Sequence, residues 1–113
     1  MQISEEQQEG VVVVAVSGRI DSTTSPTLDD HLVRLAGAGS HRVVMDLSGV
    51  DFISSAGLRV MLSLAKRTKA HQGAVVLCGL DASVREVFAM AGFLPLFAVE
   101  ATRDLAVIRT AGA

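Results

Sequence analysis

The chain has 113 residues, half of them apolar, and a formal charge of −2 at pH 7. That length and apolar content fit one domain, residues 1–113, with its own hydrophobic core. The few aromatic residues and the lack of a basic stripe argue against nucleic-acid binding. The chain starts with polar and acidic residues, and no apolar run reaches membrane-spanning length. We therefore expect a cytoplasmic protein with no membrane segment.

The first third of the chain predicts a hairpin followed by a helix. Residues 2–8 suit a short edge strand, and Glu9-Gly10 suits a tight turn. Residues 11–16 are β-branched and too apolar for a strand with one solvated face, so both faces should be covered. Ser25 is then predicted as the N-cap of a helix, because a proline follows it and leucines recur behind it at helical spacing.

The middle of the chain alternates strands with a helix. We predict a strand at residues 42–47, a connection at 48–53, a helix at about 55–71 and a strand at 74–78.

The last third predicts two more helices around a short strand. Ser83 is predicted to cap the first of these helices, with Asp81 as the competing cap. A strand at 96–99 and a helix at 102–109 complete the pattern.

Strands that alternate with helices imply crossover connections and a parallel sheet. The two N-terminal strands should pair antiparallel because a tight turn joins them. The predicted fold class is therefore α/β, a single domain with a mixed, mostly parallel sheet of four to five strands and about four α-helices.

The side chains that usually catalyse reactions or bind metals are scattered in this sequence. His31, His41 and His71 share no metal-ligand spacing with one another or with Cys78. Cys78 lies in an apolar run and is expected to be a buried, reduced thiol. No glycine-rich loop precedes a lysine, and no glycine stands where a nucleophile elbow requires it. We expect no cofactor, no metal and no enzymatic activity.

The start of the helix at Ser55 is the most informative junction. A helix N-terminus offers unpaired backbone N–H groups and partial positive charge. Ser54 is predicted to be the N-cap, which leaves the Ser55 hydroxyl free. A phosphate on Ser55 would be stabilised there, and it would add about two negative charges to a site of small neutral residues. The junction suits a phosphorylation switch, although plain capping explains the same serines.

Several short motifs also occur in a characteristic order. Gly18-Arg19-Ile20-Asp21 follows the early strand, Asp46-Leu47 ends a later one, and Phe52-Ile53-Ser54-Ser55-Ala56-Gly57-Leu58 stands at the helix start. Together with segments 75–80 and 84–93, these motifs resemble the STAS domain family, and within it the small anti-sigma factor antagonists. The resemblance covers essentially the whole chain.

This resemblance implies a binding protein with a serine switch. In that family the unphosphorylated antagonist binds an anti-sigma factor and releases the sigma factor. The anti-sigma factor is often a serine protein kinase of the histidine-kinase-like ATPase type. It phosphorylates the antagonist at the helix start, which blocks binding, and a metal-dependent serine phosphatase reverses this. Ser55 matches the phosphorylated serine.

Two positions depart from the family pattern. Ser54 stands where the best-known members have aspartate, and Ala56 stands where they have serine or threonine. The first change removes a local negative charge and makes Ser54 the second candidate acceptor.

The implied docking surface combines the helix start with a nearby loop. It comprises Ser54, Ser55, Gly57, Arg59, Gly18, Asp21, Ser22 and Thr23. Loops that follow the C-terminal ends of neighbouring parallel strands cluster together, so these segments should meet. Structural explanations remain open for some members: turn bonds at Asp21, backbone packing at Gly57 and a solvated helix face at Arg59.

Three other functions remain open. The chain could be a constitutive scaffold or structural subunit, because STAS domains also occur in larger assemblies. A nucleotide or small-molecule sensor is a further alternative, although no phosphate-cradling loop is visible. An enzyme is the least favoured, since no acid, base and nucleophile converge in the sequence.

Overall fold

Five strands form one mixed sheet in the computed structural model, which describes residues 1–113. The strands are β1 (Gln2–Gln8), β2 (Val11–Ile20), β3 (Arg42–Ile53), β4 (Ala74–Cys78) and β5 (Ala98–Glu100). They lie side by side in that order. β1 pairs antiparallel with β2, and every other neighbouring pair is parallel. The predicted mixed, mostly parallel sheet and its antiparallel N-terminal hairpin are confirmed.

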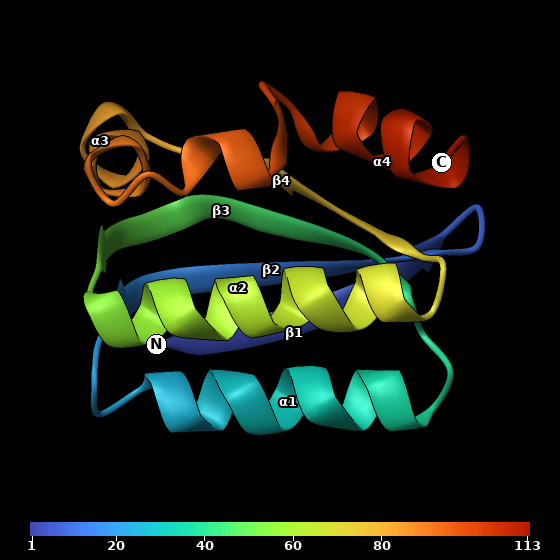
Figure 1. Cartoon of the computed structure of the whole chain (residues 1–113), viewed down its shortest axis with the longest axis horizontal. Coiled ribbons are helices and arrows are strands. Elements are labelled where there is room, and N and C mark those ends of the chain that lie inside the picture. The colour runs from blue at the N-terminus through green and yellow to red at the C-terminus, as the bar shows by residue number, and fades with distance from the viewer.

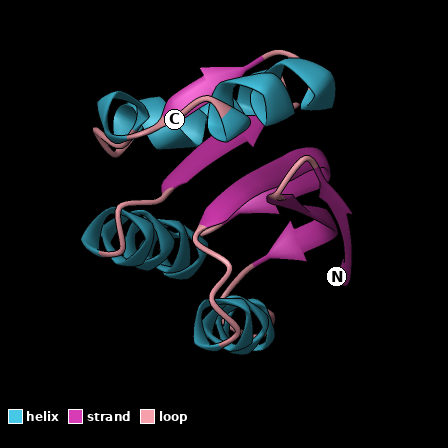
Figure 2. Cartoon of the chain, turned by 90° about the vertical axis from the view of Figure 1, so that its right-hand side faces the viewer, coloured by secondary structure: helices cyan, strands magenta, loops and turns pink.

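Four α-helices complete the fold. They are α1 (Ser25–Gly37), α2 (Ser55–Ala70), α3 (Ala82–Met90) and α4 (Arg103–Ala111), and a short 3-10 helix spans Leu94–Leu96. Helices α1 and α2 lie on one side of the sheet and α4 lies on the other (Figures 1 and 2). None of the helices combines the length and the apolar character that crossing a membrane requires.

Strand β2 shows why the sheet needs a layer on both faces. Val12, Val14 and Val16 join the larger apolar cluster, to which α1, α2 and α3 contribute. Val11 and Val13 point the opposite way into a smaller cluster with α4. Because successive side chains of a strand alternate between faces, a continuous valine run is buried only when both faces are covered. The prediction of two covered faces is confirmed.

Strand β3 is longer than its sequence suggests. Residues 48–53 were expected to be a connection, but they continue the strand and pair with β2 as far as Ile20 opposite Ile53. Val50 and Ile53 are buried on this extension. A Cβ atom on Gly49 would lie 2.8 Å from the Ser17 Cβ, so this glycine permits a close approach of two strands. The prediction was wrong because glycine and serine inside a strand resemble turn chemistry.

Two helix starts differ from the predicted caps. Ser25 is the first residue of α1 and not its cap, and Thr24 in the cap position makes no side-chain capping bond. In α3 the cap is Asp81, the competing candidate, whose carboxylate accepts the Val84 N–H at 2.8 Å. Capping by Ser83 was therefore the wrong choice of the two.

The last strand also begins later than predicted. The strand expected at 96–99 is β5 at Ala98–Glu100, because Leu94–Leu96 forms the 3-10 turn instead.

Helix α2 packs closely on the ends of β2 and β3 at Gly57. A Cβ atom there would lie 2.7 Å from both Ile20 Cγ2 and Ile53 Cγ1. Both isoleucines are buried, so neither side chain can move aside freely. Gly57 therefore fixes how deeply the start of α2 sits against the sheet.

We predict opposite effects for two glycine-to-alanine substitutions. Gly57→Ala should lower the free energy of unfolding by about 1–3 kcal/mol, because overpacking outweighs the better helix propensity of alanine. Gly37→Ala at the end of α1 is the matched control, since its Cβ would meet nothing within 4 Å. It should be neutral or stabilising by up to about 1 kcal/mol. Urea denaturation of both variants measures this, and an equal effect at the two positions would contradict the packing explanation.

Candidate functional site

The start of α2 is tied to the end of β2. Ser54 has extended backbone angles and its hydroxyl accepts the Gly57 N–H at 3.5 Å, a long capping bond. The Ser54 N–H donates to the Ile20 carbonyl oxygen at 2.8 Å. The predicted N-cap role of Ser54 is thus confirmed. Ser55, the first helical residue, is exposed and its hydroxyl bonds to no other group of the chain.

The loop between β2 and α1 lies beside this junction because Asp21 directly follows Ile20. The Asp21 carboxylate accepts the backbone N–H groups of Thr23 at 3.0 Å and Thr24 at 3.1 Å. The bond from the Thr24 N–H is the main reason why the pKa of Asp21 lies below its ordinary value. Asp21 therefore shapes the loop, which presents Ser22 and Thr23 to solvent.

The other three residues of the expected docking surface do not lie together: one is buried, one lies inside a strand and one is exposed on a helix. Gly57 is buried in the first turn of α2, which favours its packing role. Gly18 lies within β2, not in the loop, and a Cβ on it would approach the Met1 Cα to 3.2 Å. Arg59 is exposed and borders a hollow between the starts of α1 and α2 that Asp29 also lines.

A neighbouring pair, Arg19 and Phe52, was not identified from the sequence. The Arg19 guanidinium carbon lies 4.0 Å from the centroid of the Phe52 ring. Both residues are exposed, and they pair across β2 and β3 one step before Ile20 and Ile53. Their pairing depends on a register irregularity in the strands, which sequence patterns do not reveal.

A buried carboxylate on the face of the sheet that α4 covers was also missed. Asp46 on β3 is 7% exposed, and its Oδ2 atom accepts from the Arg103 Nε at 2.9 Å and lies 2.8 Å from Nη2. Arg103 also reaches Glu6 on β1, at 2.7 Å. Arg103 thereby joins β1, β3 and the first residue of α4, and we call this group the Arg103 latch.

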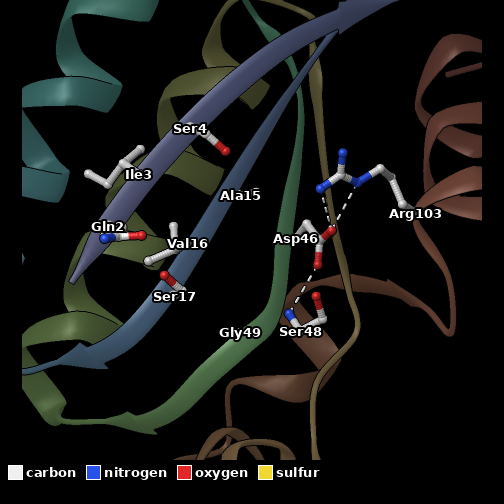
Figure 3. Close-up of a pocket in the computed structure, with 10 residues that line it drawn as sticks. All are labelled: Gln2, Ile3, Ser4, Ala15, Val16, Ser17, Asp46, Ser48, Gly49 and Arg103. Carbon is white, nitrogen blue, oxygen red and sulfur yellow. Dashed lines mark hydrogen bonds and ion pairs between the residues drawn. The ribbon is translucent and has the colours of Figure 1, made fainter.

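Figure 3 shows the hollow beside the Arg103 latch, on the part of the sheet that α4 leaves open. It measures about 490 Å³. Ser4, Ser17 and Ser48 from three neighbouring strands line it together with Asp46 and Arg103. The Arg103 guanidinium already forms ion pairs with the carboxylates of Glu6 and Asp46. Its positive charge is therefore neutralised and does not favour an anionic ligand in this hollow.

Burial and hydrogen bonding act in opposite directions on Asp46. Burial raises the pKa of its carboxyl, but hydrogen bonds from Ser48 and the ion pair with Arg103 outweigh it and leave the pKa below its ordinary value. Cys78 lies near this carboxylate. Burial first, and Asp46 second, raise the pKa of the thiol to about 11. The prediction of a buried, reduced Cys78 is confirmed.

The three histidines do not converge on a site. His31 bonds to Glu5 at 2.9 Å, whereas His41 and His71 stack on each other with ring centroids 4.1 Å apart. No group of three or more histidine, cysteine, aspartate or glutamate side chains gathers as a metal site would.

The order of strands and helices can be compared with known protein families. The sequence profile of the STAS domain matches residues 2–106. The chain belongs to the STAS domain family, as the sequence motifs predicted.

Individual relatives are consistent with this assignment. BtrV of Bordetella bronchiseptica, described as an anti-sigma factor antagonist, is 40% identical over 106 residues, which are 94% of this chain and 91% of BtrV. An anti-sigma factor antagonist of Mycobacterium paratuberculosis has a similar structure, with a TM-score of 0.88 and 27% identity over 96% of this chain and 92% of the other. The Bacillus cell fate determinant SpoIIAA in its phosphorylated form has the same fold, with a TM-score of 0.75 and 20% identity over 96% and 98% of the two chains.

We predict that the Arg103 latch stabilises the fold in a pH-dependent way. Arg103→Gln should lower the free energy of unfolding by about 1–3 kcal/mol at pH 7, because it leaves the Asp46 carboxylate buried without its cation. The folded-state pKa of Asp46 is depressed, so its contribution is present above the ordinary carboxyl pKa and lost as the pH falls through the folded-state value. The effect of the substitution should therefore shrink below about pH 4.

Arg109→Gln is the matched control for this measurement. Its partner Glu100 lies at 2.7 Å, but the Arg109 side chain is 53% exposed, so its loss should cost less than about 1 kcal/mol. Equal losses for the two variants, or a loss for Arg103→Gln that does not change with pH, would contradict the role given to Asp46.

Proposed function

We propose that this chain is an anti-sigma factor antagonist that acts as a phosphorylation-controlled binding switch. The observation that carries the proposal is the position of Ser55. It is exposed, it is the first residue of α2, and it lies beside the loop that presents Ser22 and Thr23. The BtrV relative described as an antagonist, and the existence of a phosphorylated form of SpoIIAA, support the same proposal.

In the proposed cycle the unphosphorylated chain binds its partner through the helix start and the adjacent loop. The partner is an anti-sigma factor that is also a serine protein kinase of the histidine-kinase-like ATPase type. Its capture by this chain frees the sigma factor in the cytoplasm, and a serine phosphatase later regenerates the binding form. The chain itself performs no catalysis in this scheme.

The chemistry of the helix start explains how phosphate would act. The Ser54 hydroxyl already takes the Gly57 N–H, while the N–H groups of Ser55 and Ala56 begin the helix without intrahelical acceptors. A phosphate on Ser55 would therefore be tolerated by the folded chain. Its charge of about −1.5 to −2 would stand in the docking surface and repel a closely packed partner. The switch thus needs no rearrangement of the chain.

A constitutive scaffold subunit is the second candidate function. Ser54 stands where the best-known antagonists have aspartate, so the local charge that accompanies the acceptor serine is missing here. In this alternative Ser55 is only part of a helix start, and the chain binds a permanent partner without modification.

We predict that phosphate is found on Ser55. The purified chain is incubated with ATP and a histidine-kinase-like serine kinase from the same genome, and the modified residue is mapped by mass spectrometry. Ser55→Ala should abolish modification yet change the free energy of unfolding by less than about 0.5 kcal/mol, because the side chain is exposed.

Ser54→Ala is the matched control for that experiment. It should keep the phosphate on Ser55 while costing up to about 1 kcal/mol of stability through the lost cap. Modification of Ser54 and not Ser55 would move the switch to the neighbouring residue. Tight kinase binding with no phosphate on either serine would favour the scaffold instead.

A further inference from the structure

We propose that Arg19 and Phe52 form the specificity-determining anchor of the docking surface and that they receive a partner segment with a carboxylate beside an apolar side chain. This inference rests on the proposed function and names the chemistry of the partner at that same surface. It begins from the cation–π contact of 4.0 Å between the two side chains.

A local irregularity in the sheet creates this contact. Gly18 pairs with Val50, but the next residue, Arg19, pairs with Phe52, so Asp51 is an extra residue on β3. Without this bulge Arg19 would stand opposite Asp51. Bulges re-aim side chains and occur often beside functional sites. The bulge therefore places Arg19 opposite the aromatic ring of Phe52 and not opposite the carboxylate of Asp51.

The pair is adjacent to Ser55 through the backbone. Ile20 and Ile53 are the next paired residues of the two strands, and the Ser54 N–H bonds to the Ile20 carbonyl. Because successive side chains of a strand alternate between faces, Arg19 and Phe52 point away from the face that α2 covers, and a partner meets them by extending from the start of α2 over the ends of β2 and β3.

Exposure of this aromatic residue needs an explanation. The chain has four phenylalanines, of which Phe88 and Phe97 are buried, whereas Phe52 is 37% exposed. An exposed aromatic ring beside an arginine has the composition of an interface hot spot. Its rigid face gives a partner apolar contact area at little cost in side-chain entropy.

The charges around Arg19 and Phe52 indicate which chemical group of the partner would bind there. The Asp21 Oδ2 atom lies 3.8 Å from the Arg19 Nε, which is beyond hydrogen-bond distance, while Asp21 Oδ1 accepts the hydrogen bonds of the loop. The Arg19 side chain is 60% exposed, so its N–H groups are accessible to a carboxylate of the partner.

A small hollow on the other side of Phe52 suits an apolar side chain. It measures about 180 Å³ and lies between the end of β3 and the face of α3. Four of its six lining residues are apolar, namely Phe52, Ile53, Val84 and Val87, and the other two are Asp51 and Ser83. A partner segment that places an acidic side chain on Arg19 and an apolar one in this hollow would satisfy both features.

The proposed anchor also explains how a phosphate on Ser55 would weaken binding of the partner. A phosphate on Ser55 would place negative charge close to the site where the carboxylate of the partner approaches Arg19. Like charges in a partly dehydrated interface repel each other, so the phosphate weakens the acidic partner most.

The test compares Arg19→Gln and Phe52→Leu with two control variants, Arg34→Gln and Ile108→Ala. Arg34 and Ile108 are exposed residues of α1 and α4 that stand outside the docking surface. Binding to the kinase identified by phosphate mapping is measured by calorimetry for each unphosphorylated chain. Circular dichroism and melting curves verify folding. Arg19→Gln changes a side chain that is 60% exposed, so it keeps the test valid if Phe52→Leu is destabilised.

We expect each anchor variant to bind about tenfold more weakly and the controls to bind as the wild type does. The loss for Arg19→Gln should become smaller at high salt, because it removes a charge pair. If both anchor variants bind normally while Ser55→Glu abolishes binding, the anchor is wrong and the switch stands. If the wild-type chain binds no such kinase, the anchor is overturned together with the switch.

Discussion

The parallel pairing of β2 with β3 determines where the proposed docking surface lies. Both strands end at the same level, with Ile20 opposite Ile53, and α2 starts two residues later. The bond from the Ser54 N–H to the Ile20 carbonyl and the close packing of Gly57 leave little freedom in the first turn of the helix. Ser55 is held at the surface as a consequence, while its neighbours on both strands are buried.

Because the first turn of α2 is held in place, we expect partner binding to be controlled by a change of charge and not by a movement of the helix. The two apolar clusters hold helices on both sides of the sheet, and the Arg103 latch joins α4 to β1 and β3. Under the proposed switch, a phosphate on Ser55 would therefore act on what the surface presents to a partner and not on the arrangement of the fold. In the proposed function the two states of the domain would differ by one exposed phosphate.

Much of the fold could be predicted from the sequence, because hydrophobic periodicity and turn residues fix most elements. The valine run of β2 indicated a doubly covered strand, and the spacing of apolar residues after Ser55 indicated α2. The extension of β3 could not be predicted, since Ser48 and Gly49 resemble a turn until the close approach of Ser17 is known. The caps of α1 and α3 were misassigned because neighbouring hydroxyl and carboxylate side chains compete for the same role.

The candidate site was predictable in part for a similar reason. The helix start at Ser54 and Ser55 is a local feature, so sequence could place it. The pairing of Arg19 with Phe52 and of Asp46 with Arg103 depends on a strand bulge and on contacts between residues far apart in the chain, and neither has a local pattern.

The most direct test of the account compares two forms of one chain, unmodified and carrying phosphoserine at position 55, for their affinity toward the partner kinase. The account predicts that the phosphorylated chain remains folded and binds at least about a hundredfold more weakly, which corresponds to about 2.7 kcal/mol. Equal affinity of the two forms would contradict the claim that charge at the start of α2 controls the partner.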